Sequence, residues 1–293
     1  MPFPLHILLT SAAVQASPAP PEPPQVDRPS EDLRVEITPT AWFPRLIGTY
    51  AIGPEGTELN VETDTYLHES ELAFQGELDY RFDAWSLRIL GTEFSTSGSG
   101  ILEASARVAG TDVAAGSDWS STYSQWSIGA EVGLALWQPF ADRPFPWSAP
   151  TERVDNSGPE ADYLVEFRIG PRLGFRYLHV DQVFQSTAAD VDYRFDGGVA
   201  ALVLGVVVET EVDTRPIVPF LDSIAIEAGF TVSPLLAGGS GNLSSIEASL
   251  RAYLTPSASL VFGFRLQRTS FTSEEYEREG AVMGVITGCS FRF

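Results

Sequence analysis

Apolar and polar residues alternate with a period of two over long stretches of this chain. Between residues 163 and 177 one face carries Tyr163, Val165, Phe167, Ile169, Leu173, Phe175 and Tyr177. The other face carries Glu166, Arg168, Arg172 and Arg176. Successive side chains of a β-strand point to opposite sides, so this alternation predicts strands with one apolar and one polar face. Runs of this length exceed the usual strand of a globular domain, which has about five or six residues.

The spacing of turns divides the alternating pattern into ten antiparallel strands. Tight turns at Asp83-Ala84 and at Thr255-Pro256-Ser257 set the direction of their neighbours. The expected strands are 33–47, 71–82, 85–94, 119–137, 160–180, 197–211, 223–233, 244–254, 258–268 and 280–293. Segments 58–64 and 101–109 are either loop extensions or an extra pair of strands. We therefore expect an all-β, up-and-down antiparallel barrel of about ten strands, with twelve or eight as alternatives.

The composition excludes membrane-spanning helices and one class of binding partner. Hydrophobic residues make up 44% of the chain, but no stretch approaches the roughly 20 apolar residues of a membrane-spanning helix. If the chain crosses a membrane, it does so as a barrel. The formal net charge is -21, from 39 acidic and 18 basic residues, and every basic residue is Arg. Such an acidic chain is not expected to bind nucleic acid, whose phosphates require a basic surface.

The N-terminal part of the chain predicts a segment that directs secretion and where the folded domain begins. Residues 1–16 contain a short apolar core, Leu5 to Val14, and resemble a secretory signal peptide. Residues 17–32 are rich in Pro and predict a disordered linker. The barrel domain is then expected to occupy residues 33–293, which contain the single Cys289 and so no intrachain disulfide.

The last strand carries a more specific signal. Met283, Val285, Thr287, Cys289, Phe291 and Phe293 share one face, and the strand closes on an aromatic residue. It resembles the assembly signal of bacterial outer-membrane β-barrels, carried here by Met283, Val285, Phe291 and Phe293. The resemblance implies a transmembrane barrel in the outer membrane, with outer-membrane lipid and the barrel-assembly machinery as partners and a monomeric state.

The polar faces of the predicted strands place both signs of charge in the lumen. The acids are Glu77, Asp79, Glu131, Glu166, Glu209, Glu227 and Glu247, and the bases are Arg81, Arg88, Arg168, Arg172, Arg176, Arg251, Arg265 and Arg292. About ten strands is near the size at which side chains fill a barrel. We therefore expect Arg–carboxylate pairs to close the lumen and the loops to mediate structural or surface interactions. A narrow channel or transporter for polar or hydrophobic solutes is the alternative.

A second alternative is an enzyme at the outer rim. His179 and Asp181 lie near the outer end of one predicted strand, and Asp118 precedes another. A His with carboxylates could activate water. This layout resembles the omptin-type proteases of the outer membrane, which are also ten-stranded barrels, although the His-x-Asp order is reversed. Solvated loop residues are the favoured interpretation, and no cofactor or metal is expected because no phosphate-loop or zinc spacing occurs.

Overall fold

The computed structural model describes residues 34–67, 69–139, 165–215, 217–218 and 220–293. The predicted signal peptide, the Pro-rich linker and most of the segment 138–164 lie outside these residues. The strands are β1 (Arg34–Ile52), β2 (Leu59–Asn60), β3 (Ala73–Phe82), β4 (Trp85–Ile101), β5 (Ala106–Val108), β6 (Thr111–Val113), β7 (Asp118–Leu134), β8 (Val165–Ser186), β9 (Val191–Asp213), β10 (Ser223–Ala237), β11 (Ser240–Thr255), β12 (Ala258–Thr272) and β13 (Tyr276–Arg292). No helix in the described part of the chain is long and apolar enough to cross a membrane.

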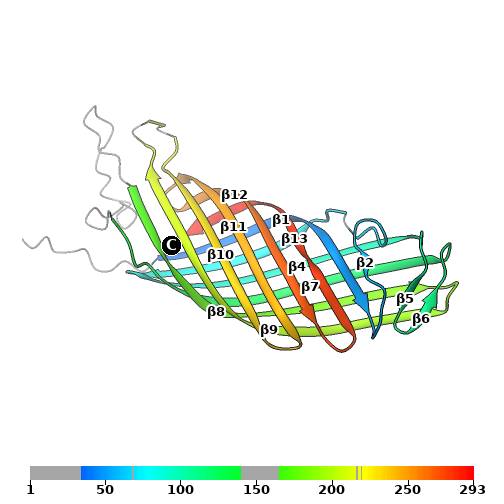
Figure 1. The fold of residues 1–293 in the computed structure, drawn as a ribbon. Coiled ribbons are helices and arrows are strands. Elements are labelled where there is room, and N and C mark those ends of the chain that lie inside the picture. The colour runs from blue at the N-terminus through cyan, green and yellow to red at the C-terminus, as the bar shows by residue number, and fades with distance from the viewer. Residues whose placement is uncertain (1–33, 68, 140–164, 216, 219) are drawn as a thin grey trace, which may run out of the picture. The chain divides into compact units, whose positions relative to one another are not determined.

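Ten long strands close on themselves as an antiparallel barrel (Figure 1). Within the described residues, each strand of the series β1, β3, β4 and β7 to β13 pairs with the next, and β13 pairs with β1. The closing register runs from Glu36 opposite Arg292 to Ile52 opposite Tyr276. The prediction of a ten-stranded up-and-down barrel is therefore confirmed.

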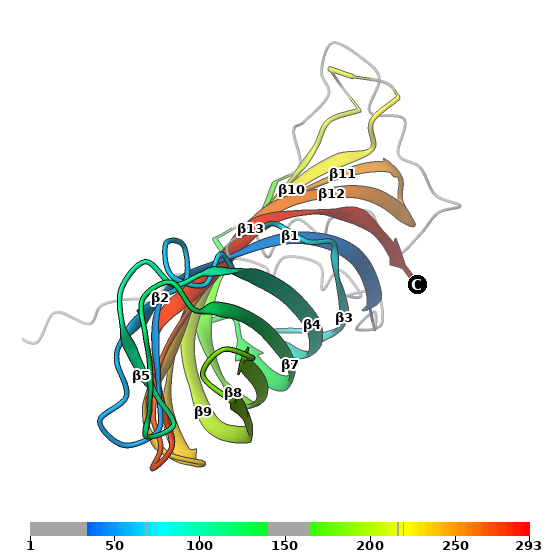
Figure 2. The ribbon, with the colours of Figure 1, turned by 90° about the vertical axis from the view of Figure 1, so that its right-hand side faces the viewer.

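The two segments left open by the sequence do not add barrel strands. Residues 59–60 form β2, which pairs with the far end of β1. Strands β5 and β6 pair only with each other, as a small separate hairpin. Figure 1 shows both at the end of the barrel away from the C-terminus, and Figure 2 views the molecule from that end. We call this end distal, and the end that holds Arg34 and Arg292 proximal.

The strands continue further toward the distal end than predicted. Strands β8 and β9 have 22 and 23 residues and are joined by a turn at residues 187–190. The predicted acidic loop at 269–279 is reduced to residues 273–275 between β12 and β13. At the proximal end, strand β7 stops at Leu134 rather than Trp137, which forms only an isolated bridge with Ile169.

An apolar belt surrounds the proximal part of the outer wall. Strand β7 contributes the outward-facing Trp126, Ile128 and Val132, which are 43%, 53% and 44% exposed. The other strands add exposed apolar side chains, among them Ile37, Phe43, Phe74, Leu78, Tyr80, Leu87, Ile89, Leu173, Phe175, Tyr177, Leu204, Val206, Ile226, Phe230, Ile246, Leu250, Phe262, Phe264, Val285 and Phe291. On β3 the exposed apolar side chains extend from Phe74 to Phe82, which matches the roughly 9–11 residues of a tilted membrane-spanning strand.

Beyond the belt, the apolar face changes sides. On β8, Phe175 and Tyr177 face outward, but the next apolar residues, Leu178, Val180 and Phe184, are buried inside. The outward positions of the distal wall are polar instead and include Arg45, Glu93, Ser120, Thr122, Asp192, Arg194, Asp196, Arg268, Glu277 and Glu279. The distal part is thus a β-structure with a polar exterior and its own apolar core, as expected for a part exposed to water. We call it the distal extension.

Candidate functional site

Buried charges line the lumen at the level of the apolar belt. They come from strands on every side of the barrel because each strand presents alternate residues to the interior. The structure places all of the predicted lumen residues on the inner wall or at its proximal mouth, and each makes at least one ion pair, the set being Glu77, Asp79, Arg81, Arg88, Glu131, Glu166, Arg168, Arg172, Arg176, Glu209, Glu227, Glu247, Arg251, Arg265 and Arg292.

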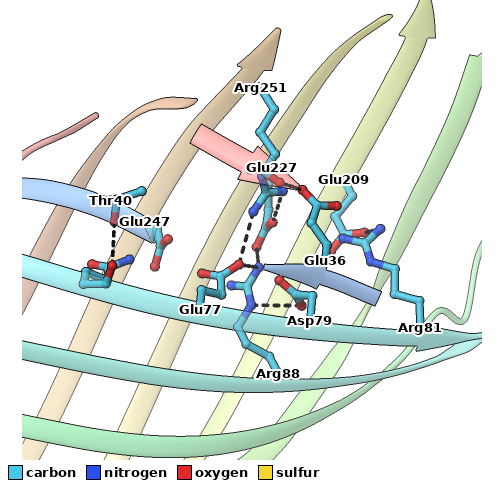
Figure 3. Close-up of polar contacts among 12 residues, drawn as sticks. Glu36, Thr40, Glu77, Asp79, Arg81, Arg88, Glu209, Glu227, Glu247 and Arg251 are labelled. Atoms are coloured by element: carbon cyan, nitrogen blue, oxygen red, sulfur yellow. Dashed lines mark hydrogen bonds and ion pairs between the residues drawn. The ribbon is translucent and has the colours of Figure 1, made fainter. Parts of the chain in front are cut away.

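Glu227 on β10 is the centre of this network (Figure 3). Its carboxylate lies 2.5 Å from Arg88 of β4, 3.0 Å from Arg172 of β8 and 3.0 Å from Arg251 of β11. Strands β4 and β10 are four places apart in the ring of ten, so the Arg88 pair crosses the lumen. A single 5%-exposed carboxylate therefore ties three sides of the barrel together.

A second cross-lumen connection involves β3 and β11. Arg251 contacts Glu77 at 3.1 Å, and Arg88 contacts the same carboxylate at 3.0 Å and Asp79 at 3.3 Å. Toward the distal side, Arg265 pairs with Glu247 and donates to the Gln75 side-chain oxygen at 2.7 Å. Carboxylates and guanidinium groups alternate through the lumen, so each buried charge is offset by opposite charges.

The proximal mouth continues the same pattern. Arg81 lies 2.7 Å from Glu209, and Arg168 lies 2.6 Å from Glu166. Around them the structure leaves a cavity of about 20 Å³. That volume holds about one water molecule.

Two glycines of β7 face the lumen beside arginines of β8. Gly133 stands directly opposite Arg172, and Gly129 stands opposite Arg176. A Cβ added at Gly133 would lie 2.5 Å from the Ser86 Oγ atom, so a side chain at this position would require Ser86 to move.

The structure adds members that the sequence analysis missed. Glu36 on β1 contacts Arg34 at 2.5 Å and Arg251 at 3.5 Å. Glu211 on β9 contacts Arg292 at 3.2 Å. Both follow the period-two pattern of their strands, at Glu36, Thr38 and Thr40 and at Glu209 and Glu211, so the same parity rule could have found them. Arg278 is also internal, although it was expected in a loop.

The distal extension is closed by a hydrophobic core. Its members are nearly inaccessible and come from the barrel strands and the distal segments, including Trp42, Leu46, Tyr50, Ile52, Leu59, Val61, Leu67, Phe94, Leu102, Val108, Val113, Trp119, Tyr123, Leu178, Val180, Phe184, Phe271 and Tyr276. Aromatic rings stack through it, for example Trp119 on Phe184 at 6.4 Å and Phe195 on Tyr276 at 4.3 Å between centroids. The lumen is therefore filled twice, by charges at the belt and by apolar groups beyond it.

The predicted rim residues do not form one site. His179 faces outward just beyond the belt, stacks on Trp126, and has its Nε2 atom 3.4 Å from Asp196. Asp181 is held by Arg194 at 2.6 Å. Because Trp126 stands opposite His179 and Asp118 is eight residues further along β7, Asp118 lies about 26 Å further along the barrel wall. Asp118 accepts instead from the Ala188 backbone N–H at 3.0 Å, so the structure does not bring these three candidate residues together.

The residues assigned to the C-terminal assembly signal lie on the outer wall. Val285 and Phe291 are 55% and 43% exposed on β13, Met283 is half-buried on the same face, and Phe293 is 75% exposed just after the strand. They form part of the apolar belt.

A closed antiparallel barrel with an apolar outer belt and a charged interior is the architecture of the bacterial outer-membrane β-barrels. The sequence-based resemblance to this class is confirmed at the level of the fold. No protein-family model and no curated protein matches the sequence.

Solved structures of the same class are similar to this chain. The outer-membrane protease OmpT of Escherichia coli has 9% identity and a TM-score of 0.46, covering 89% of this chain and 97% of that one. The translocator domain of autotransporter NalP from Neisseria meningitidis has 10% identity and a TM-score of 0.35, with 89% and 87% covered. The Pseudomonas putida toluene transporter TodX has 8% identity and a TM-score of 0.23, with 91% of each chain covered. These similarities extend to the fold alone.

Proposed function

We propose that this chain is a monomeric outer-membrane barrel with a closed lumen, which acts through the surface of its distal extension rather than by conducting solutes. The observation that carries the proposal is the cross-lumen network at Glu227. A pore would require a continuous aqueous path, whereas this carboxylate and its three arginines join opposite walls at the level of the belt.

The outer wall supports the proposed membrane location. Exposed apolar side chains such as Phe175 at 63% and Ile128 at 53% form a continuous surface on every strand of the barrel. A soluble protein rarely exposes an apolar surface of that extent, and lipid acyl chains would cover it. The polar wall beyond Tyr177 then marks the edge of the bilayer on the distal side.

The distal extension would project into water as a rigid platform. Strand β8 continues for nine residues after Tyr177, to Ser186, which corresponds to about 30 Å along the strand. An apolar core and paired backbones hold this part in place, so the side chains on its surface keep fixed positions. A preorganised surface binds a partner with less loss of conformational entropy than flexible loops do.

Planar-bilayer recording of the purified, refolded protein tests the closed lumen. We expect no stable conductance for the wild type. We expect intermittent conductance for Glu227→Ala combined with Arg88→Ala, because both partners of an ion pair that crosses the lumen are then removed. Arg45→Ala combined with Glu62→Ala is the matched control, since this pair lies on the outer surface with side chains 47% and 41% exposed. A large, stable wild-type conductance would overturn the closed barrel in favour of a channel.

Site-specific labelling tests the orientation. In a Cys289→Ser background, a cysteine placed at Thr122 on the distal wall should react with a membrane-impermeant maleimide on intact cells. A cysteine placed at Ala84 in the proximal β3–β4 turn should react only after the outer membrane is opened. The reverse pattern would place the distal extension in the periplasm and contradict a surface role.

A further inference from the structure

Arg278 is a buried cation within the apolar core of the distal extension. Its side chain comes from β13, and the residue is 2% exposed. Tyr50 of β1 and Phe271 of β12 are its direct neighbours in the sheet. Its guanidinium carbon lies 4.4 Å from the centre of the Tyr123 ring, which comes from β7 on another side of the lumen.

The positive charge of Arg278 has no carboxylate beside it. Each arginine of the belt-level network has a carboxylate oxygen within 4.0 Å, whereas no ion pair of Arg278 occurs among the described residues. Its Nε and Nη2 atoms are buried without a hydrogen-bond partner in this part of the chain. Arg does not lose its proton in proteins, so this charge cannot be removed by titration.

The contact with Tyr123 offsets only part of the cost. A cation–π contact contributes about 0.5–2 kcal/mol, whereas an isolated buried ion costs several kcal/mol. A compact anion beside the guanidinium would supply both the missing charge and the missing acceptor.

Other polar groups around Arg278 also lack partners among the described residues. Tyr123 donates to the Gln125 Oε1 atom at 2.7 Å, which leaves the Gln125 Nε2 group buried and unpaired. The Thr96 hydroxyl, on the strand position opposite Tyr123, is buried and unpaired as well. So is the Thr269 hydroxyl, at the diagonal position to Arg278 across β12 and β13.

The charge of Arg278, and not the hydrogen-bonding groups alone, favours an anion over water. The Thr96 and Thr269 hydroxyls accept as well as donate, so water can satisfy them, but neutral water leaves the guanidinium charge uncompensated. An anion accepts from several donors at once. Tyr50 and Phe271 beside it are 2% exposed, so an anion here would have to be compact.

We propose that the distal core binds a small monovalent anion of the halide type beside Arg278, held by its Nε and Nη2 groups. The anion completes the core, so the packing of the distal extension depends on it. This site is separate from the belt-level network, in which every arginine already has a carboxylate partner.

The thermal midpoint of the refolded protein in chloride and in gluconate at equal ionic strength tests the proposal. Equal ionic strength screens the belt-level pairs equally, and gluconate is too large for the site. We expect chloride to raise the midpoint by about 5 °C or more at roughly 100 times its dissociation constant. Arg278→Met should abolish the difference between the salts. Arg268→Met, which removes an exposed arginine paired with Glu279, should keep it.

Bromide provides a measurement on the unaltered protein, so that a folding defect of Arg278→Met leaves the test intact. Crystals grown in bromide should show an anomalous peak next to the Arg278 guanidinium. Equal midpoints in the two salts together with no peak at Arg278 would overturn the anion site. A chloride effect that persists in Arg278→Met would equally overturn it.

Discussion

Replacing Glu227 with Gln removes one negative charge from the centre of the lumen at nearly constant volume. The change weakens three ion pairs, with Arg88 at 2.5 Å, Arg172 at 3.0 Å and Arg251 at 3.0 Å. Because the side chain keeps its size, any loss of stability reports the charge network and not a new cavity.

The expected loss follows from what each arginine retains. Removing one partner of a buried ion pair costs about 3–5 kcal/mol. Arg88 and Arg251 keep Glu77 at 3.0 Å and 3.1 Å, and Arg172 keeps Glu209 at 3.3 Å. These second partners put the expected loss at the lower end, about 3 kcal/mol, or a midpoint lower by about 6–12 °C.

Urea unfolding in lipid vesicles, followed by tryptophan fluorescence and by the gel shift of the heat-unfolded form, measures this loss. Glu62→Gln is the control, because its pair with Arg45 lies on the exposed surface and is expected to contribute at most about 1 kcal/mol. If the free energy of unfolding falls no more in Glu227→Gln than in Glu62→Gln, water fills the lumen and the barrel is not closed.

Two further substitutions test the two walls of the barrel. Phe184→Ala, in the distal core where the ring stacks on Trp119, should lose about 3–5 kcal/mol in the same urea assay, with Ser120→Ala nearly neutral; a loss below 1 kcal/mol would contradict a packed core. Phe175→Arg on the apolar belt should lose about 2–4 kcal/mol in vesicles, whereas Gln185→Arg on the distal wall of the same strand should change stability by less than about 0.5 kcal/mol. Equal effects at the two positions would mean that the belt does not contact lipid.

The strand number and the two faces of the belt could be predicted from the sequence because they depend on local periodicity. Each proximal strand alternates without interruption, as in the Phe167-to-Tyr177 stretch, and tight turns such as Asp83-Ala84 mark strand ends. Once these strands form a barrel, its closure sets the register in which β13 pairs with β1. These are properties that neighbouring residues encode directly.

The distal extension was not predicted because its strands carry their apolar residues on the inner face, whereas the strands of the belt carry them on the outer face. After Tyr177 the apolar residues move to the inner face, so a pattern search for apolar-out strands stops there and assigns charged segments such as 269–279 to loops. The cross-lumen pairs are beyond reach for another reason. Arg88 and Glu227 are 139 residues apart in the chain, and only the closed barrel brings them together.

The reversal of polarity beyond the belt has a consequence for how the chain reaches its final position. In the proposed orientation, insertion carries the distal strands through the hydrocarbon region with Asp192, Asp196, Glu277 and Glu279 on their outer face. A charge on the lipid face of a barrel costs about 2–4 kcal/mol at the bilayer midplane for Arg, and less for Asp or Glu. The adjacent strand β8 carries Leu178, Val180 and Phe184 on its inner face, unprotected until the core has closed. Spontaneous insertion thus meets a barrier that grows with the height of the extension, and we expect rapid folding only where a catalyst shelters or locally thins the membrane. Once the charges have crossed, the same barrier opposes their return and fixes the barrel in place.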